Sequence, residues 1–299
     1  MSTSTESGAP SAQPEQVAGQ VALDGLVRLL DLEQIEVNLF RGVSPPHSPP
    51  RVFGGQVAGQ ALVAAGRTVP DDRKVHSLHA YFVRPGDPRI PIVYEAERVR
   101  DGRSFTTRRV LAIQRGEAIF ALSASFQLPQ EGLEHTLPAP VDVPGPESLP
   151  DLASLIAAGD IGWLGTGPRP LDMRFVTAPV WSVDRTKATG APAQVWIRAD
   201  GVLPDDPLLH VCVLTYASDL TLLGSALARH DRPPKPVQMA SLDHAMWFHR
   251  PFRADEWLLY TCYSPTAQGG RGLTTGQFTT IDGTLVATTV QEGLVRLPG

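Results

Sequence analysis

The sequence predicts an α+β protein built from two similar units, in each of which a buried helix precedes an antiparallel sheet. Three observations predict this class. The chain has 299 residues, which suits two domains of about 150 residues each. Hydrophobic periodicity changes from helical to strand-like in both halves of the chain. Short motifs also recur between the two strand-rich blocks at a nearly constant separation, which indicates an internal repeat.

The first unit is expected to contain a helix over residues 56–65, directly after the Gly54-Gly55 pair. Glycine and alanine occupy five positions within it, so another backbone can approach closely and the helix should be buried. Leucine spacing predicts a further helix upstream, over residues 19–31.

Four strands are expected after the first buried helix, with hairpin signals at Asp101-Gly102 and Arg115-Gly116 between them. Their predicted ranges are 76–84, 92–100, 105–114 and 118–128.

The second unit repeats this order. Residues 205–228 predict one long helix that is apolar almost all round, with Pro207 tolerated in its first turn. A strand over residues 193–199 precedes it, and Asp282-Gly283 marks a hairpin after it. The other predicted strands cover residues 237–248, 257–263, 272–281 and 284–296.

The repeat gives the predicted architecture. Arg84-Pro85 and Arg250-Pro251 are 166 residues apart, and Gly116 and Gly283 are 167 apart. One helix cradled by a curved antiparallel sheet is the hotdog arrangement, so two copies predict a double hotdog. The expected boundaries are a disordered tail at 1–17, an N-terminal hotdog domain at 18–130, a proline-rich linker at 131–170 and a C-terminal hotdog domain at 171–299.

Composition excludes several classes of function. A net charge of −5 disfavours nucleic acid as the main partner. Cys212 and Cys262 form no metal-binding or disulfide pattern, which suits buried thiols in a reducing compartment. The sequence shows no secretory signal, no apolar run of about 18 residues for a membrane span, and no peroxisomal address, so a cytoplasmic location is expected.

Five stretches of the sequence resemble the acyl-CoA thioesterase II enzymes of the bacterial TesB type and their peroxisomal relatives. The resemblance runs from about residue 22 to 297. The stretches are VFGGQVAGQAL (52–62), HSLHAYFVRPGD (76–87), ASDL (217–220), SLDHAMWFHRPF (241–252) and VQEG (290–293).

The resemblance implies a catalytic set of Asp219, Ser241 and Gln291, which match an Asp, a Thr or Ser, and a Gln of the family pattern. It also implies an acyl-CoA substrate, no cofactor, and assembly as a homo-oligomer, a dimer or tetramer. Physically, the three side chains suit general-base catalysis, because a carboxylate in an apolar segment can draw a proton from a water that the hydroxyl and the carboxamide help to hold.

Alternatives remain beside this interpretation. A hotdog enoyl-CoA hydratase generally needs an Asp–His pair, and Asp219 has no His within one helical turn. A catalytically silent acyl-CoA-binding protein would not need all three residues. A serine nucleophile is disfavoured because the chain has no G-x-S-x-G elbow, and because Ser241 and His244 would face opposite sides of a strand.

Other polar residues receive structural interpretations. His244 and His249 are five apart on a predicted strand, so they cannot chelate one metal and are expected in the core or at the surface. The Gly54-Gly55-Gln56 start of the first helix is a candidate degenerate second site. Five arginines form either a coenzyme A phosphate site or a solvated sheet face: Arg98, Arg100, Arg103, Arg108 and Arg109.

Overall fold

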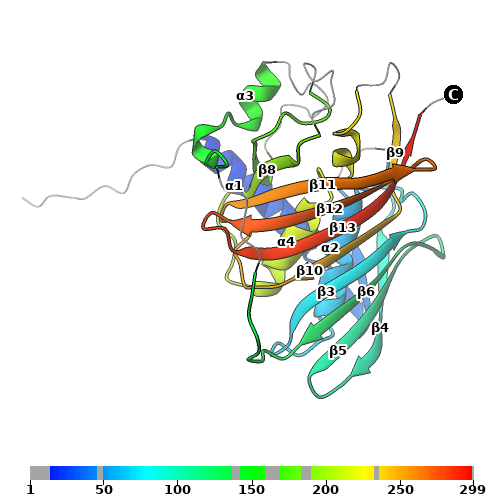
Figure 1. Ribbon diagram of the computed structural model, residues 1–299. Helices are drawn as coiled ribbons and strands as arrows, with labels where there is room; N and C mark the ends of the chain where they lie inside the picture. Colours follow the sequence, from blue (N-terminus) through cyan, green and yellow to red (C-terminus); the bar gives the residue numbers. More distant parts are fainter. Residues whose placement is uncertain are drawn as a thin grey trace, which may run out of the picture.

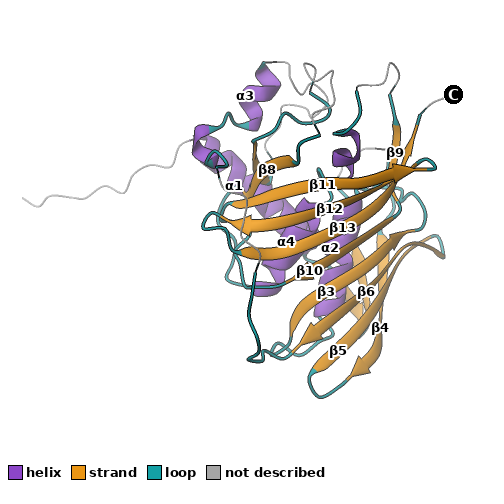
Figure 2. Ribbon diagram, viewed as in Figure 1, coloured by secondary structure: helices purple, strands orange, loops and turns teal. Residues whose placement is uncertain are grey.

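The computed structural model describes residues 14–45, 50–136, 142–158, 169–182, 190–231 and 236–297. Within these ranges thirteen strands form one curved antiparallel sheet, and two long helices lie against one face of it (Figures 1 and 2). The sheet follows the order β1-β2-β4-β5-β6-β3-β10-β13-β12-β11-β8-β7, with β9 paired to β13.

The N-terminal half supplies six of the strands. They are β1 (Glu33–Glu36), β2 (Leu39–Gly42), β3 (Lys74–Phe82), β4 (Ile92–Asp101), β5 (Phe105–Gln114) and β6 (Glu117–Gln127). The predicted hairpin at Arg115-Gly116 joins β5 to β6, and both of its residues have positive φ, 52° and 78°. Positive φ at two successive turn residues matches the twist of the flanking strands.

The C-terminal half supplies the other seven strands. They are β7 (Leu171–Phe175), β8 (Ala193–Ala199), β9 (Gln238–Ser241), β10 (Asp243–Phe248), β11 (Leu258–Gln268), β12 (Arg271–Thr280) and β13 (Leu285–Arg296). Strands β3 and β10 pair antiparallel, from Asp243 opposite Tyr81 to Trp247 opposite Ser77, and so join the two halves into one sheet.

Helix α1 (Pro14–Leu30) begins inside the segment that the sequence assigns to a disordered tail. Proline is tolerated in a first turn, which lets the helix predicted from residue 19 extend backwards. Residues 1–13 of that tail lie outside the described residues, as do 137–141 and 159–168 of the linker. The linker contains one short helix among its described residues, α3 (Leu152–Ala157), preceded by a 3-10 turn at Pro146–Ser148.

Two antiparallel helices fill the concave side of the sheet: α2 (Gly54–Gly66) and α4 (Pro207–Ser218) (Figure 1). Their backbones lie very close, because a Cβ on Gly55 would sit 2.4 Å from the carbonyl oxygen of Tyr216. A Cβ on Gly59 would sit 3.2 Å from the carbonyl oxygen of Cys212. The small residues of α2 therefore permit the close helix contact that the sequence predicts.

The long helix predicted over residues 205–228 is interrupted. Helix α4 ends at Ser218, Asp219 caps it, and a 3-10 helix, η3 (Leu223–Leu227), follows after a turn. By length and composition alone Pro207–Leu227 would suit a membrane span, but half of its most apolar window is buried inside the fold. Because α4 packs against α2 inside the fold, its apolar composition is that of a core helix.

The linker segment covers part of the sheet face that points away from the helices. The Trp196 indole N–H donates to the carbonyl oxygen of Pro144 at 2.8 Å, and that of Trp257 donates to the Glu147 carboxylate at 3.0 Å. The Arg198 guanidinium lies 4.2 Å from the centre of the Trp257 ring, a cation–π contact. These contacts fix the described part of the linker to the C-terminal half.

Candidate active site

The structure brings together the three residues that the resemblance singles out. The Gln291 carboxamide donates to the Asp219 carboxylate, with 2.8 Å between Nε2 and Oδ1. Ser241 also lies close enough to this carboxylate to lower its pKa. Ser241 and Gln291 come from neighbouring strands, because Ser241 on β9 pairs with Gly293 on β13. Their catalytic role stays a prediction, but the fold places both of them beside the Asp219 carboxylate.

Asp219 occupies this place because α4 ends at the preceding residue. Asp219 is the C-cap residue of α4, although its backbone stays in the helical region, with φ −84° and ψ −5°. The sequence from 219 to 222 has no glycine or proline to reveal the end of the helix. The contacts of Asp219 with other segments therefore coincide with a break that hydrophobic periodicity does not detect.

The carboxyl group of Asp219 has a perturbed acidity. Burial raises its pKa from 3.8 to about 6, because the charged form loses hydration. Hydrogen bonds from Gln291, from the backbone N–H of Gly55 and from Ser241 act in the opposite direction, since they stabilise the carboxylate. A carboxylate with a pKa near 6 is ionised at neutral pH and is a stronger base than an ordinary aspartate.

The start of α2 belongs to the same site. A Cβ on Gly54 would lie 2.6 Å from Oδ2 of Asp219 and 2.7 Å from the Phe82 ring, so any larger residue there would displace the carboxylate or the ring. The Phe53 N-cap provides no side-chain hydrogen bond to the helix, which leaves the first-turn N–H groups of α2 without a capping side chain. From the sequence, Gly54 and Gly55 were candidates for a degenerate second site. The structure places them beside Asp219 instead.

The other ends of the same two helices meet without comparable chemistry. Gly66 at the end of α2 approaches Leu208 in the first turn of α4. Asp206 caps this turn by accepting from the Leu208 N–H at 2.9 Å, and Pro207 contributes no N–H. Arg67, which follows α2 as Asp219 follows α4, donates to Asp31. The charged groups at this end are therefore engaged in capping α4 and in an ion pair with Asp31.

The remaining polar candidates have structural partners. The Arg108 side chain is 1 % exposed and donates to Thr68 and to the Asp101 carboxylate, so it is no part of a solvent-facing basic patch. His249 contacts the Thr288 hydroxyl at 2.8 Å, whereas His244 is fully buried. Among the described residues no cluster of three or more His, Cys, Asp or Glu could hold a metal ion.

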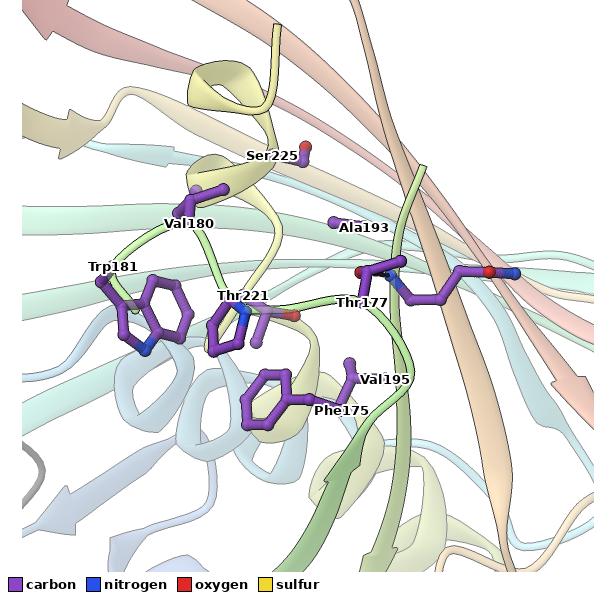
Figure 3. A pocket seen from close by; sticks show the side chains of 11 residues that line it. Phe175, Thr177, Val180, Trp181, Ala193, Val195, Thr221 and Ser225 are labelled. Atoms are coloured by element: carbon purple, nitrogen blue, oxygen red, sulfur yellow. Dashed lines mark hydrogen bonds between the residues drawn. The ribbon is translucent and has the colours of Figure 1, made fainter. Parts of the chain in front are cut away.

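Two apolar hollows lie near the end of α4, where Thr221 lines both of them. One has about 520 Å³ of empty space, including space open to solvent, and lies between Tyr216, Leu220 and residues of β7 and α3. A second, with about 300 Å³, shares Phe175, Trp181 and Thr221 with the first and extends toward η3 (Figure 3). The sequence pattern gave no sign of these hollows, because their walls come from segments far apart in the chain.

Comparison with known proteins settles the family. A family model described as acyl-CoA thioesterase matches residues 171–294, and one described as acyl-CoA thioesterase N-terminal domain matches residues 43–127. Acyl-coenzyme A thioesterase 8 of Mus musculus is 43 % identical over 285 residues, which cover 90 % of this chain and 88 % of the mouse protein. The chain belongs to the TesB-type acyl-CoA thioesterase family.

Solved structures confirm the double hotdog fold for this member of the acyl-CoA thioesterase family. The crystal structure of the acyl-CoA thioesterase II TesB2 from Mycobacterium marinum is 48 % identical, with a TM-score of 0.77 over 92 % of this chain and 98 % of that one. A protein with a hot dog fold from Alicyclobacillus acidocaldarius superposes with a TM-score of 0.74 at 21 % identity, covering 92 % and 99 % of the two chains.

Proposed function

We propose that the protein hydrolyses fatty acyl-CoA to a free fatty acid and coenzyme A, with water as the nucleophile and Asp219 as the general base. Membership of the acyl-CoA thioesterase family supports the reaction class. The observation that carries the residue assignment is the Asp219 carboxylate, which contacts Gln291, Ser241 and the start of α2.

In the proposed reaction, a water held by the polar side chains attacks the thioester carbonyl carbon while Asp219 accepts its proton. The tetrahedral intermediate then collapses, the carbon–sulfur bond breaks, and Asp219 returns the proton to the departing thiolate. The N–H of Gly55 donates to Asp219, so the adjacent first-turn N–H groups of Gly54 and Gln56 are the proposed donors to the oxyanion. The N-terminal end of α2 also favours negative charge.

The competing reactions find less support. In a serine mechanism His244 would have to contact Ser241, yet its Nε2 lies 2.9 Å from the hydroxyl of Ser218. The same contact argues against an Asp–His pair of the hydratase type, because it engages the residue before Asp219. A silent binding protein would not need Asp219 to be both hydrogen-bonded and raised in pKa.

A thiol-release assay over a series of acyl-CoA chain lengths tests the function. Release of coenzyme A with equimolar free fatty acid is expected. Loss of enoyl absorbance from an enoyl-CoA without thiol release would instead identify a hydratase, and binding without either reaction would identify a silent acyl-CoA-binding protein.

The pH dependence of hydrolysis should report the Asp219 carboxyl. Since only the carboxylate form accepts a proton and its pKa is raised to about 6, kcat should fall as pH decreases through a limb centred near pH 6. Steady-state kinetics between pH 4.5 and 8, roughly the range over which a group of this pKa titrates, measures the limb. A flat profile down to pH 5 would contradict Asp219 as the base.

The hollows near the end of α4, which Leu220 and Thr221 help to line, suit the acyl chain. Trp181 lines both hollows, and the centre of its ring is 6.3 Å from the centre of the Phe175 ring. Trp181→Ala should extend the space and shift the chain-length preference toward longer acyl groups, by about fourfold in kcat/KM per additional buried methylene (~0.8 kcal/mol each). Val202→Ala, at a side chain exposed outside the hollows, is the control. An unchanged ratio of long-chain to short-chain kcat/KM in Trp181→Ala would place the acyl chain elsewhere.

Assembly as a homo-oligomer and a cytoplasmic location complete the proposal. Light scattering on the purified protein measures the first, and fractionation of the producing cells measures the second. A monomer at assay concentration would contradict the proposed assembly.

A further inference from the structure

His244 and Gln291 are neighbours on adjacent strands. Ala245 on β10 pairs with Val290 on β13, and Ser241 on β9 pairs with Gly293. The register therefore shifts by one residue between these pairs, and Asp243 and His244 share the position opposite Gln291. The side chains of His244 and Gln291 point to the helix side of the sheet and are fully buried, with 1 % and 0 % of their surface exposed. Side chains opposite each other in a ladder have Cβ atoms about 5 Å apart, within reach of a shared hydrogen-bond partner.

The two side chains end on consecutive residues of the α4 terminus. His244 Nε2 lies 2.9 Å from the Ser218 hydroxyl, and Gln291 Nε2 lies 2.8 Å from the Asp219 carboxylate. The Ser218 carbonyl oxygen is in turn fixed by the Tyr260 hydroxyl at 3.1 Å. Side chains of the sheet therefore anchor the end of α4 through three hydrogen bonds, from His244, Gln291 and Tyr260. The hydrogen bond from Gln291 is the one that reaches the proposed base.

Each of the pair keeps one buried polar atom with no partner among the described residues: Nδ1 of His244 and Oε1 of Gln291. Buried polar atoms are rarely left unsatisfied, since burying one without a hydrogen bond costs free energy. Two such atoms on facing residues beside a carboxylate point to a shared partner.

The donor hydrogens of Ser218, His244 and Gln291 show which kind of partner the two atoms need. Ser218 has one hydroxyl hydrogen, which it donates to the Thr215 carbonyl oxygen at 2.8 Å. Its oxygen then accepts from Nε2–H of His244, which leaves Nδ1 of the neutral imidazole as an acceptor. Gln291 directs its NH₂ group to Asp219, which leaves Oε1 as an acceptor too. A single water molecule has the two hydrogens that both atoms lack.

We propose that His244 is a positioning residue for the reaction: it and Gln291 accept the two hydrogens of one buried water, which holds the carboxamide with its NH₂ group toward Asp219. Without this partner the carboxamide keeps only its contact with Asp219, so it can tilt in the site and weaken its hydrogen bond to the base. Burial lowers the pKa of His244 to about 4, so the imidazole stays neutral, as an acceptor at Nδ1 requires, over the working range of the enzyme. The inference rests on the proposed function of Asp219.

Two substitutions separate this role from a purely structural one. Asparagine at position 244 places its amide near the position of Nδ1, so it keeps the contact with the water and loses the one with Ser218. Glutamine reaches the position of Nε2, so it keeps the contact with Ser218 and loses the one with the water. We expect His244→Asn to stay within about threefold of wild-type kcat and His244→Gln to lose about tenfold, the worth of one hydrogen bond, with KM unchanged in both. In His244→Gln the acid limb of kcat should also move to higher pH, because the hydrogen bond that stabilises the carboxylate of Asp219 is weakened.

The reverse order of the two variants, or equal losses with an unmoved acid limb, would overturn the positioning role and leave only the contact with Ser218. A high-resolution crystal structure of the wild-type protein decides the question without any assay: the inference requires one water within hydrogen-bonding distance of both Nδ1 and Oε1. Absence of ordered density there would overturn it even in an active enzyme. Lack of thiol release by the wild type would instead overturn the proposed function, while the crystal structure would still test the shared water.

Discussion

Asp219→Asn is expected to lower kcat for acyl-CoA hydrolysis by about 10²–10⁴-fold, with little change in the fold. Asparagine keeps the shape of the side chain, and its oxygen still accepts from Gln291, but the amide cannot take a proton from water. Turnover of acyl-CoA by the purified variant measures the loss, and its circular dichroism and Tm establish that it folds.

A matched control lies at the opposite end of the same helix. Asp206 caps the first turn of α4 through its carboxylate, and asparagine is as good an N-cap as aspartate. Asp206→Asn should therefore retain wild-type kcat. If Asp219→Asn kept near wild-type turnover while remaining folded, the general-base assignment would be wrong.

Gly55→Ala should produce the second large effect, on both activity and stability. The added Cβ would lie 2.4 Å from the backbone carbonyl oxygen of Tyr216, and backbone cannot move aside as the end of a flexible side chain can. The start of α2 must shift away from the end of α4, which separates the proposed oxyanion donors from Asp219. We expect kcat to fall by about 10²-fold, the cost of a misplacement near 1 Å, and stability to fall by about 1–3 kcal/mol.

Gly25→Ala provides the comparison, because a Cβ at Gly25 in α1 would meet only the end of the flexible Arg28 side chain, at 3.9 Å. That change should leave kcat unaltered and stabilise the helix by about 0.5–1 kcal/mol. Urea denaturation and steady-state kinetics on both variants measure the difference. Equal behaviour of the two variants would show that the helix contact does not need a glycine at position 55.

Regular elements were predictable because local pattern determines them. The bounds of β5 (Phe105–Gln114) and β8 (Ala193–Ala199) agree with those expected from alternation and turn signals. Strands β1, β2 and β7 were not predicted, since each has only four or five residues; all four residues of β1 are exposed, so it shows no alternation. The strand predicted over 237–248 is divided at Leu242 into β9 and β10. The Leu242 N–H still donates to the Glu292 carbonyl oxygen on β13, but the register against β13 shifts by one residue after it.

The site was predictable only in part. The family resemblance named Asp219, Ser241 and Gln291, but no local pattern indicates that α4 ends at Ser218 or that the start of α2 lies beside Asp219. Those features depend on the antiparallel contact of two helices about 150 residues apart in the chain. For the same reason the roles considered for Gly54-Gly55 and Arg108 changed: the glycines lie at the proposed site, and the arginine is buried.

Isotope labelling during a single turnover tests the proposed mechanism most directly. With enzyme in excess over acyl-CoA in H₂¹⁸O, attack by water places one ¹⁸O atom in the fatty acid and none in the protein. Mass spectrometry of the product and of the peptides containing Asp219 and Ser241 measures both. We expect labelled fatty acid and unmodified peptides; ¹⁸O in the Asp219 carboxyl, or an acyl group on Ser241, would contradict the water mechanism.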